Sequence, residues 1–432
     1  MSHTRHSNRP LWYPLDNSAK IFPAIRTNHI SAVYRVTVIL KTDIDPDLLL
    51  TALKDILPRF PGFTLRMRPG FFWYYLESNY RTPKIYPDTR FPCRRLYRKD
   101  NDGYLFRVLY HTKRISVEFF HSLTDGSGAM IFLKTLAARY LTLQGIEIPD
   151  EEGILPLHEQ PHPEEMEDSA RRYAKPTNRF IRRPPVAFHL KGVPEPMGRI
   201  HVIIARMPIA AIREKAKLMG ISINDLLAAA YMDAFNRVQQ AAERRPRRPI
   251  VIAIPVNMRQ IYPSKTLRNF FQRVYPTLMP GYQAHTFEEI VSLVHHSVRL
   301  GMNEKELNTK MSANLRRERQ LALRLIPLFV KNWILKAMFR MYGDSRYTST
   351  LSNLGIVRLP EAMKDHVAGF EVIIGPSLDN VVNAGVVSYG QELTITFSRR
   401  IHEPIIERLM LTRLVGMGIP VTVFSNAAPP RR

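Results

Sequence analysis

Runs of alternating and helically spaced apolar residues divide the first part of the chain into strands and helices. Alternation predicts strands at 28–40, 104–110 and 114–120, and a hairpin at 63–78 that turns at Pro69 and Gly70. Helical spacing appears at 45–57 and 126–143. From about 147 to 198 the pattern breaks into an acidic, proline-rich stretch followed by a basic run. We interpret this break as an ordered crossover between two halves.

The second half repeats the mixture of strands and helices. Strands are predicted at 200–208, 249–259, 348–355 and in the strand-rich end of the chain, with helices at 210–220, 222–239, much of 287–341 and 403–415. Ser222 and Asp225 are spaced as a capping box. Because strands and helices do not alternate regularly, the pattern predicts an α/β fold with mixed sheets. We expect an N-terminal lobe at 1–165, a crossover or linker at 166–198 and a C-terminal lobe at 199–432.

The stretch EFFHSLTDGSGAM, 118–130, holds the candidate chemistry. His121 continues the parity of the apolar residues of the preceding strand, so it is predicted to leave that strand on the buried face. Asp125 and the small residues after it form a turn into an apolar helix. A neutral histidine with a pKa near 6.5 can act as a general base at neutral pH. The alternative is a core histidine followed by an aspartate that only caps the helix.

Charge and cysteine content narrow the class of protein. The formal net charge of the 432 residues is +24, which is typical of a protein that binds nucleic acid, an anionic membrane or an anionic ligand. Basic residues cluster at 171–183 and 243–248, but no nucleic-acid-binding motif accompanies them, so nucleic acid is the less favoured partner. Cys93 is the sole cysteine, which excludes an intrachain disulfide. With no apolar segment of a secretion signal at the N-terminus, we expect a cytoplasmic location.

One apolar segment, 321–342, could contact a membrane. Arg324, Lys331, Lys336 and Arg340 interrupt it, so it is not a convincing transmembrane span. The first interpretation is a largely buried helix whose basic side chains extend to the surface. The second is a surface helix that makes peripheral contact with anionic lipid.

A resemblance to a known family favours the catalytic interpretation of His121. FHSLTDGSG, 120–128, resembles the HHxxxDG motif of the HXXXD acyltransferases, a superfamily that includes chloramphenicol acetyltransferase, BAHD enzymes and peptide-synthetase condensation domains. Its bacterial alcohol-acetyltransferase-like branch also looks similar in segments at 11–25, 59–79, 254–271 and 348–355, in the same order. Phe120 departs from condensation domains, which have a first histidine there.

The resemblance implies a fold and a set of roles. The fold would be two similar α/β lobes with a tunnel between them. His121 would be the general base of direct acyl transfer from a thioester, with acyl-CoA as co-substrate and neither a bound cofactor nor a metal. Asp125 would point away from His121 and pair with Arg259, and together with Gly126 it would hold the loop. Ser352 and Asn353 would be candidates for the oxyanion site, or else residues that only satisfy the backbone at a strand end.

Candidates for binding the donor are less specific. Gly128, like Gly126, lacks a side chain and would let the backbone approach the pantetheine arm closely. Lys265 and Arg268, with Tyr262 and Asn269 nearby, could meet an anionic donor or help to join the lobes.

Three functions remain open from the sequence. The first is an acyl-CoA-dependent O-acyltransferase that moves an acyl group, expected to be acetyl, to an acceptor hydroxyl. Its small-molecule partner is expected to be an alcohol, with an amine as the alternative. The second is a condensation-type enzyme fed by an acyl carrier protein, with an amine or hydroxyl acceptor. The third is a non-catalytic binding protein of the same fold, against which the intact His121, Asp125 and Gly126 argue.

Overall fold

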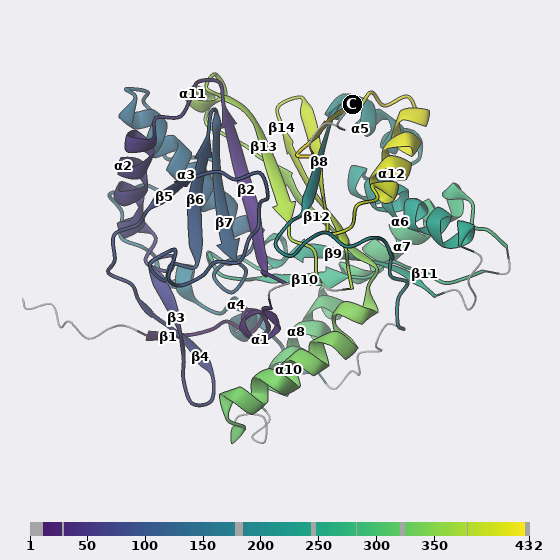
Figure 1. Cartoon of the computed structure of the whole chain (residues 1–432), viewed down its shortest axis with the longest axis horizontal. Helices are drawn as coiled ribbons and strands as arrows, with labels where there is room; N and C mark the ends of the chain where they lie inside the picture. Colours follow the sequence, from purple (N-terminus) through teal and green to yellow (C-terminus); the bar gives the residue numbers. More distant parts are fainter. Residues whose placement is uncertain are drawn as a thin grey trace, which may run out of the picture.

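Two large sheets lie side by side in the computed structural model, with helices on their outer faces (Figure 1). Both sheets contain parallel and antiparallel pairs, which confirms the predicted α/β class with mixed sheets. The structure describes residues 12–27, 30–177, 185–242, 248–281, 283–319, 325–377 and 379–427.

The first sheet is built mainly from the N-terminal part of the chain. Its strands follow the order β13–β2–β7–β6–β5, with bounds Val367–Ile374, Val33–Leu40, Arg114–Phe120, Phe106–His111 and Ile85–Pro87. Helices α2 (Pro46–Ile56) and α3 (Gly126–Leu143) pack on each other and on this sheet. The α3 bounds match the predicted helix because Asp125 accepts hydrogen bonds from the first exposed N–H groups and so fixes its start.

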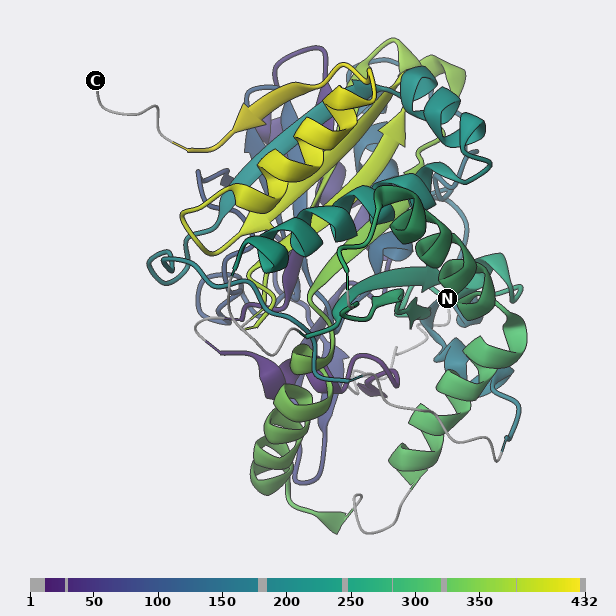
Figure 2. The same cartoon turned by 90° about the vertical axis from the view of Figure 1, so that its right-hand side faces the viewer.

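The second sheet belongs to the C-terminal part. Within the described residues its order is β10–β9–β12–β14–β15–β8–β16, with β11 beside β9, and the bounds are Phe271–Val274, Ile250–Asn257, Ser349–Ile356, Val382–Tyr389, Glu392–Arg399, His201–Pro208, Thr422–Ser425 and Thr277–Leu278. The outer helices are α5 (Ile209–Leu218), α6 (Ile223–Ala241), α7 (Phe287–Gly301) and α12 (Ile405–Gly416), and Figure 2 shows α12, in yellow, lying over the strands. The capping box of Ser222 and Asp225 is present at the start of α6.

One strand crosses between the two parts. Strand β13 comes from the C-terminal segment but pairs antiparallel with β2 over its length. It also lies close to β14 of the second sheet, where a Cβ on Gly385 would stand 2.5 Å from the Val372 carbonyl oxygen. The glycine therefore lets the two sheets approach closely. A division of the chain at residues 165 and 199 does not by itself separate the two sheets.

The crossover segment begins with two short helices. It contains the 3₁₀-helix η2 (Pro163–Met166) and the short helix α4 (Ser169–Tyr173). Arg59 forms a buried ion pair with Glu165, and the Leu267 N–H donates to the Glu165 carbonyl oxygen. The start of the crossover thus connects the segment after α2 to the loop before β10. Most of the basic cluster at 243–248 lies outside the described residues.

The segment at 321–342 is not a largely buried helix. Its described part forms α10 (Leu328–Tyr342), which lies at the lower edge of the molecule in Figure 1 beside the hairpin of β3 (Leu65–Pro69) and β4 (Tyr74–Ser78). Phe329 and Trp333 are 76% and 79% exposed. The first interpretation is therefore wrong, because apolar residues occur on all sides of this helix and only one side is covered. Among the described residues, no helix is both long enough and apolar enough to cross a bilayer.

The remaining elements are short or peripheral. Strand β1 (Trp12–Pro14) pairs with β4 in a small sheet, and α1 (Ile21–Ile25) packs on α10. Helices α8 (Glu304–Arg319) and α11 (Glu361–Lys364) and the 3₁₀-helices η1 (Leu57–Arg59), η3 (Met258–Gln260) and η4 (Asp344–Arg346) complete the described elements.

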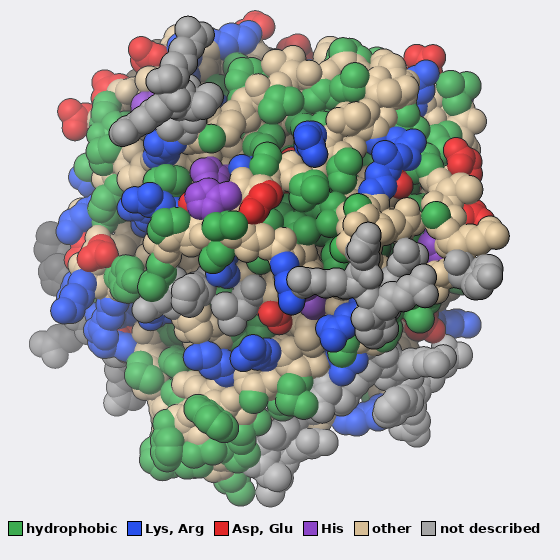
Figure 3. All heavy atoms as spheres, turned by 45° about the vertical axis from the view of Figure 1, so that its right-hand side comes forward, with side chains coloured by type: hydrophobic (Ala, Val, Ile, Leu, Met, Phe, Trp, Pro, Cys, Tyr) green, Lys and Arg blue, Asp and Glu red, His purple; other side chains and the backbone are tan. Residues whose placement is uncertain are grey.

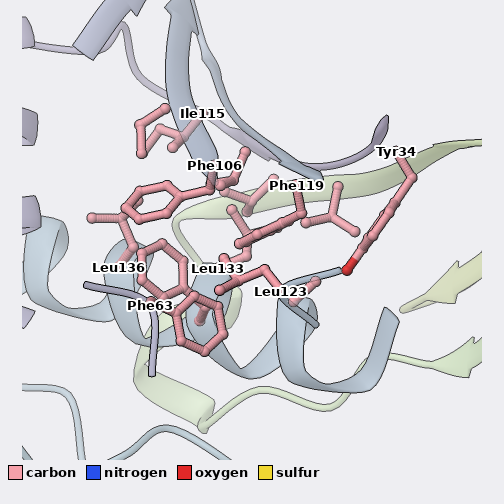
Figure 4. Packing of buried hydrophobic residues seen from close by; sticks show 14 of the residues in the cluster. Tyr34, Phe63, Phe106, Ile115, Phe119, Leu123, Leu133 and Leu136 are labelled. Atoms are coloured by element: carbon pink, nitrogen blue, oxygen red, sulfur yellow. The ribbon is translucent and has the colours of Figure 1, made fainter. Parts of the chain in front are cut away.

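An aromatic cluster holds β7 against α3. Phe119 of β7 packs edge-on against Phe132 of α3, and Phe132 stacks on Phe63 at a centroid distance of 4.8 Å. Figure 4 shows Tyr34 at the margin of this cluster, with its hydroxyl near Leu123. That hydroxyl donates to the Thr124 carbonyl oxygen at 3.1 Å. The core thus fixes both ends of the loop 121–125.

Candidate functional site

His121 lies in the turn immediately after β7. Ile115, Val117 and Phe119 are buried as predicted, but Ser116 and Glu118 on the opposite face of the strand are buried too. Strand parity therefore could not by itself decide where the histidine points. Its backbone N–H donates to the Ala32 carbonyl oxygen at 2.9 Å, which extends the β2–β7 pairing by one residue. This bond fixes His121 where the two sheets meet.

Aromatic rings enclose the imidazole. Phe22 of α1 stacks on it at a centroid distance of 4.4 Å and an interplanar angle of 8°, while Tyr34 and Phe271 lie at 4.9 and 5.6 Å. The part of the ring that stays exposed faces a cavity of about 620 Å³. The ring is therefore held in one orientation at the wall of that cavity.

Asn269 sets the tautomer of His121. Its amide nitrogen donates to the His121 carbonyl oxygen at 3.0 Å and to Asp16 Oδ2 at 3.1 Å, so its Oδ1 must face the ring. His121 Nδ1 lies 3.1 Å from that oxygen. We therefore assign the proton to Nδ1, which donates to Asn269, and the lone pair to Nε2. Nε2 is the atom that can accept a proton.

The surroundings also keep the imidazole neutral. Burial lowers the pKa of His121 from 6.5 to about 4. The hydrogen bond to its own backbone acts in the opposite direction, whereas the positive charge of Arg273 lowers the pKa further. At neutral pH nearly every molecule then carries the unprotonated, proton-accepting form.

Asp125 is committed to the loop and helix rather than to His121. Its Oδ1 accepts from the N–H groups of Ser127 and Gly128 at 3.1 and 3.2 Å. Its Oδ2 accepts from Arg259 Nη1 and from the Phe270 N–H, both at 2.8 Å. With both oxygens accepting two hydrogen bonds each, Asp125 makes no triad with the histidine, whose Nδ1 partner is Asn269.

Arg259 in turn connects the second sheet to this loop. Besides Asp125, its guanidinium donates to the carbonyl oxygens of Thr266 and Arg268. It also contacts Asn257 Oδ1 at 3.2 Å. The pair Asp125–Arg259 therefore joins the start of α3 to the end of β9.

The two glycines after Asp125 lie in different surroundings. Gly126 lines the cavity, and a Cβ there would stand 2.5 Å from Leu354 Cδ2. Gly128 is buried, and a Cβ there would stand 2.3 Å from the Leu267 carbonyl oxygen. The absence of a side chain at Gly128 is thus explained by packing against the loop before β10, and Gly128 is not among the residues that line the cavity.

Ser352 and Asn353 line the cavity from β12. The Asn353 side chain accepts from the Gly355 N–H at 2.8 Å, and its amide nitrogen lies 3.4 Å from Asn224 Oδ1. The pairing of β12 with β14 shifts register after Asn353, so the strand is irregular at this point. The structure brings both residues to the cavity that His121 lines.

Lys265 and Arg268 lie away from the cavity wall. Lys265 is exposed on the loop before β10. Arg268 is buried and donates to the carbonyl oxygens of Pro14 and Met166, with Asp16 Oδ2 at 3.6 Å from Nε. These contacts connect it to the N-terminal segment and the crossover, and a role in donor binding stays a prediction.

Arg273 is a residue of the cavity that the sequence did not single out. It is two residues from Phe271 on β10, and its guanidinium lies 5.7 Å from the ring centres of both Phe271 and Tyr347. No described carboxylate lies within ion-pair distance of it, and its Nε has no described hydrogen-bond partner. A positive charge therefore sits one aromatic ring away from His121.

A cluster of two histidines and a glutamate lies away from His121 in the described part of the chain. Glu195 Oε1 is 2.5 Å from His201 Nε2 and 2.9 Å from His402 Nδ1. These are hydrogen-bond separations, whereas ligand atoms around a tetrahedral zinc ion would be about 3.3 Å apart, given bonds of about 2.0–2.1 Å. None of the three lines the cavity, and a metal-free site at His121 stays a prediction.

Comparison with known proteins shows the fold. The condensation domain of the Monacolin K polyketide synthase MokA superposes with a TM-score of 0.60 at 13% identity, covering 95% of this chain and 97% of that one. The chain has the condensation-domain fold. TRI101 of F. sporotrichioides, complexed with Coenzyme A and T-2, gives 0.59 at 14% identity over 96% and 100%. A wax ester synthase/diacylglycerol acyltransferase from Marinobacter aquaeolei VT8 gives 0.54 at 12% identity over 94% and 99%.

No family model and no curated protein matches the sequence. At these identities the likeness is one of fold, and function has to be argued from the site.

Proposed function

We propose that the protein is an acyltransferase that moves an acyl group from a thioester to an acceptor hydroxyl. The observation that carries the proposal is His121, a neutral imidazole with its Nδ1 anchored on Asn269, at the wall of a large cavity between the two sheets. The MokA, TRI101 and wax ester synthase structures share this fold. Membership of the alcohol-acetyltransferase-like branch rests on the sequence resemblance alone.

In the proposed reaction His121 Nε2 removes the proton of the acceptor hydroxyl. The hydroxyl oxygen attacks the thioester carbonyl carbon, and the carbonyl electron pair moves onto oxygen. When this tetrahedral intermediate collapses, the carbon–sulfur bond breaks and the thiolate takes the proton back from the imidazolium. Ser352 is the preferred donor to the oxyanion, because it lines the cavity and its hydroxyl makes no hydrogen bond to a described residue.

The proposed donor is acyl-CoA, supplied in the cytoplasm. The net charge of +24 favours an anionic donor, and Arg273 adds positive charge at the cavity itself. TRI101 was solved with Coenzyme A. A donor carried by an acidic carrier protein is the second candidate, because the same basic charge would favour that partner. An amine remains the alternative to a hydroxyl acceptor.

The test is release of free thiol from a panel of acyl-CoA thioesters in the presence of pooled alcohols and amines. We expect release that depends on both donor and acceptor, and a rate at least about a hundredfold lower in His121→Ala. If CoA thioesters are inactive while the acyl carrier-protein thioester is used, the second candidate holds. A protein that binds acyl-CoA but releases no thiol from either donor would be a non-catalytic binding protein.

The pH dependence tests how His121 is tuned. Because the base must be unprotonated and its pKa is about 4, we expect the transfer rate to rise through about pH 4 and to be level at neutral pH. In Arg273→Gln the neighbouring positive charge is lost, so the pKa of His121 should rise and the acidic limb should shift to higher pH. The exposed Arg213→Gln is the control and should leave the profile unchanged. An unshifted limb in Arg273→Gln would show that Arg273 does not act on the base.

A further inference from the structure

The outer side of α10 and the β3–β4 turn form one exposed apolar surface. Its main residues are Phe71 in the turn and Phe329 and Trp333 on the helix, which are 72%, 76% and 79% exposed. Leu325 just before the helix and Met341 at its far end are exposed as well. Large apolar side chains scattered singly over a protein need no explanation, but a group of this kind marks a site of interaction. We call it the α10 surface.

Specific contacts hold the turn and the helix together. The Leu328 N–H donates to the Phe71 carbonyl oxygen at 2.8 Å, and Lys331 Nζ donates to the Phe72 carbonyl oxygen at the same distance. Lys331 Nζ also lies 3.7 Å from the centre of the Trp73 ring. The exposed rings are therefore presented by one connected unit of hairpin and helix.

The helix has two chemically different sides. Leu328 and Lys331 are buried, and Phe339 further along this inner side lines the cavity of His121. Phe329, Trp333, Lys336 and Arg340 are spaced at i, i+4, i+7 and i+11 and are all exposed. The outer side thus carries its large aromatic rings on the first turns and its basic residues on the last turns, where Met338 and Met341 are also exposed.

The charged side chains of α10 are all positive. Helix α10 contains no acidic residue, and no described carboxylate lies within ion-pair distance of Lys336 or Arg340. Figure 3 shows hydrophobic side chains gathered at the lower end of the molecule with Lys and Arg side chains directly above them. A bilayer with anionic headgroups matches both parts of the surface, because its apolar interior can take up the rings and its phosphates can bind the cations.

A second copy of the chain fits this surface less well. In a two-fold interface the same patch would face itself, so the basic end of α10 would meet either its own copy or the apolar end of the partner. Each chain would also bring a net charge of +24. An anionic partner removes this repulsion, and a second copy does not.

We propose that the α10 surface binds the face of an anionic lipid bilayer. Phe71, Phe329 and Trp333 enter the interfacial region, and Lys336 and Arg340 contact headgroup phosphates. Because Phe339 lies on the inner side of the same helix, this binding places the cavity next to the membrane. The proposal does not depend on acyl transfer, since lipid binding is measured without donor or acceptor.

The first experiment is sedimentation of the full chain with vesicles of phosphatidylcholine and phosphatidylglycerol, compared with vesicles of phosphatidylcholine alone. We expect binding to the anionic vesicles and a partition coefficient at least about tenfold lower for the neutral ones. The variant Phe71→Ser/Phe329→Ser/Trp333→Ser should bind the anionic vesicles at least about tenfold more weakly. Its circular dichroism and melting temperature should match the wild type, because these side chains are exposed.

Matched controls carry the same kinds of change elsewhere. Leu218→Ser/Leu300→Ser/Val415→Ser removes exposed apolar side chains from other helices and should bind normally. Lys336→Gln/Arg340→Gln should weaken binding by roughly fivefold for each charge, and Arg213→Gln/Lys217→Gln should not.

Three results would overturn the proposal. They are no vesicle binding by the wild type, equal loss in the test and control variants, or a dimer in light scattering that the triple serine variant abolishes while vesicle binding stays unchanged.

Discussion

His121→Ala is expected to abolish most acyl transfer while leaving the protein folded. A general base contributes about 10²- to 10⁴-fold to the rate, and the cavity retains every other group that lines it. The imidazole makes one side-chain hydrogen bond, to Asn269, and one close stack, on Phe22. Because its remaining exposure is to the cavity, water can replace it, and the melting temperature should change little. Thiol release and thermal unfolding measure the two effects separately.

Two additions make this result specific to the base. His111→Ala removes an exposed histidine from the neighbouring β6 and should keep wild-type activity. Imidazole added to the buffer should restore part of the rate of His121→Ala, because it can enter the space left by the ring and accept the proton. Wild-type activity in His121→Ala would rule out the mechanism. A large loss of stability with no rescue by imidazole would instead assign His121 a structural role.

The sequence predicted best what depends on neighbours along the chain. Helix α3 begins where predicted because Asp125 caps its first turn, and it ends where the helical spacing of apolar residues ends. His121, Asp125 and Gly126 share one short stretch, and Arg259 comes from a second segment that carries the resemblance. These residues could be named without knowing how the sheets pair, but the residues that surround them in the structure could not be named in this way.

The residues that tune His121 come from remote segments. Asn269 is 148 positions away from it and Arg273 lies on the same remote segment. Phe22, which stacks on the ring, and Asp16, which bonds to Asn269, come from a second segment near the N-terminus. Their types are common in loops and strands, so no local pattern separates them from structural residues. From the sequence, Asn269 is only a possible donor-binding or lobe-joining residue. Likewise, pairing of β13 with β2 depends on register between segments more than 300 residues apart.

Asp125→Asn is expected to lose stability and activity together. Each carboxylate oxygen of Asp125 accepts two hydrogen bonds, Oδ1 from the N–H groups that begin α3 and Oδ2 from Arg259 and the Phe270 N–H. An asparagine has one oxygen, so in either orientation its NH₂ group faces two donors. The guanidinium of Arg259 also loses its carboxylate partner in a buried site. Breaking one side of a buried ion pair costs about 3–5 kcal/mol.

The loss of stability in Asp125→Asn should depend on the presence of Arg259, and a double-mutant cycle measures that dependence. If Asp125 serves to anchor the loop, the free energy of unfolding lost in the double variant Asp125→Asn/Arg259→Met should be smaller than the sum of the losses in the two single variants. Denaturant unfolding of all three variants measures this difference. The exposed Asp365→Asn is the matched control and should unfold like the wild type. Asp125→Asn that unfolds like the wild type but transfers no acyl group would contradict the anchoring role. Asp125 would then have to act on the reacting groups, although its present bonds leave neither oxygen directed at His121.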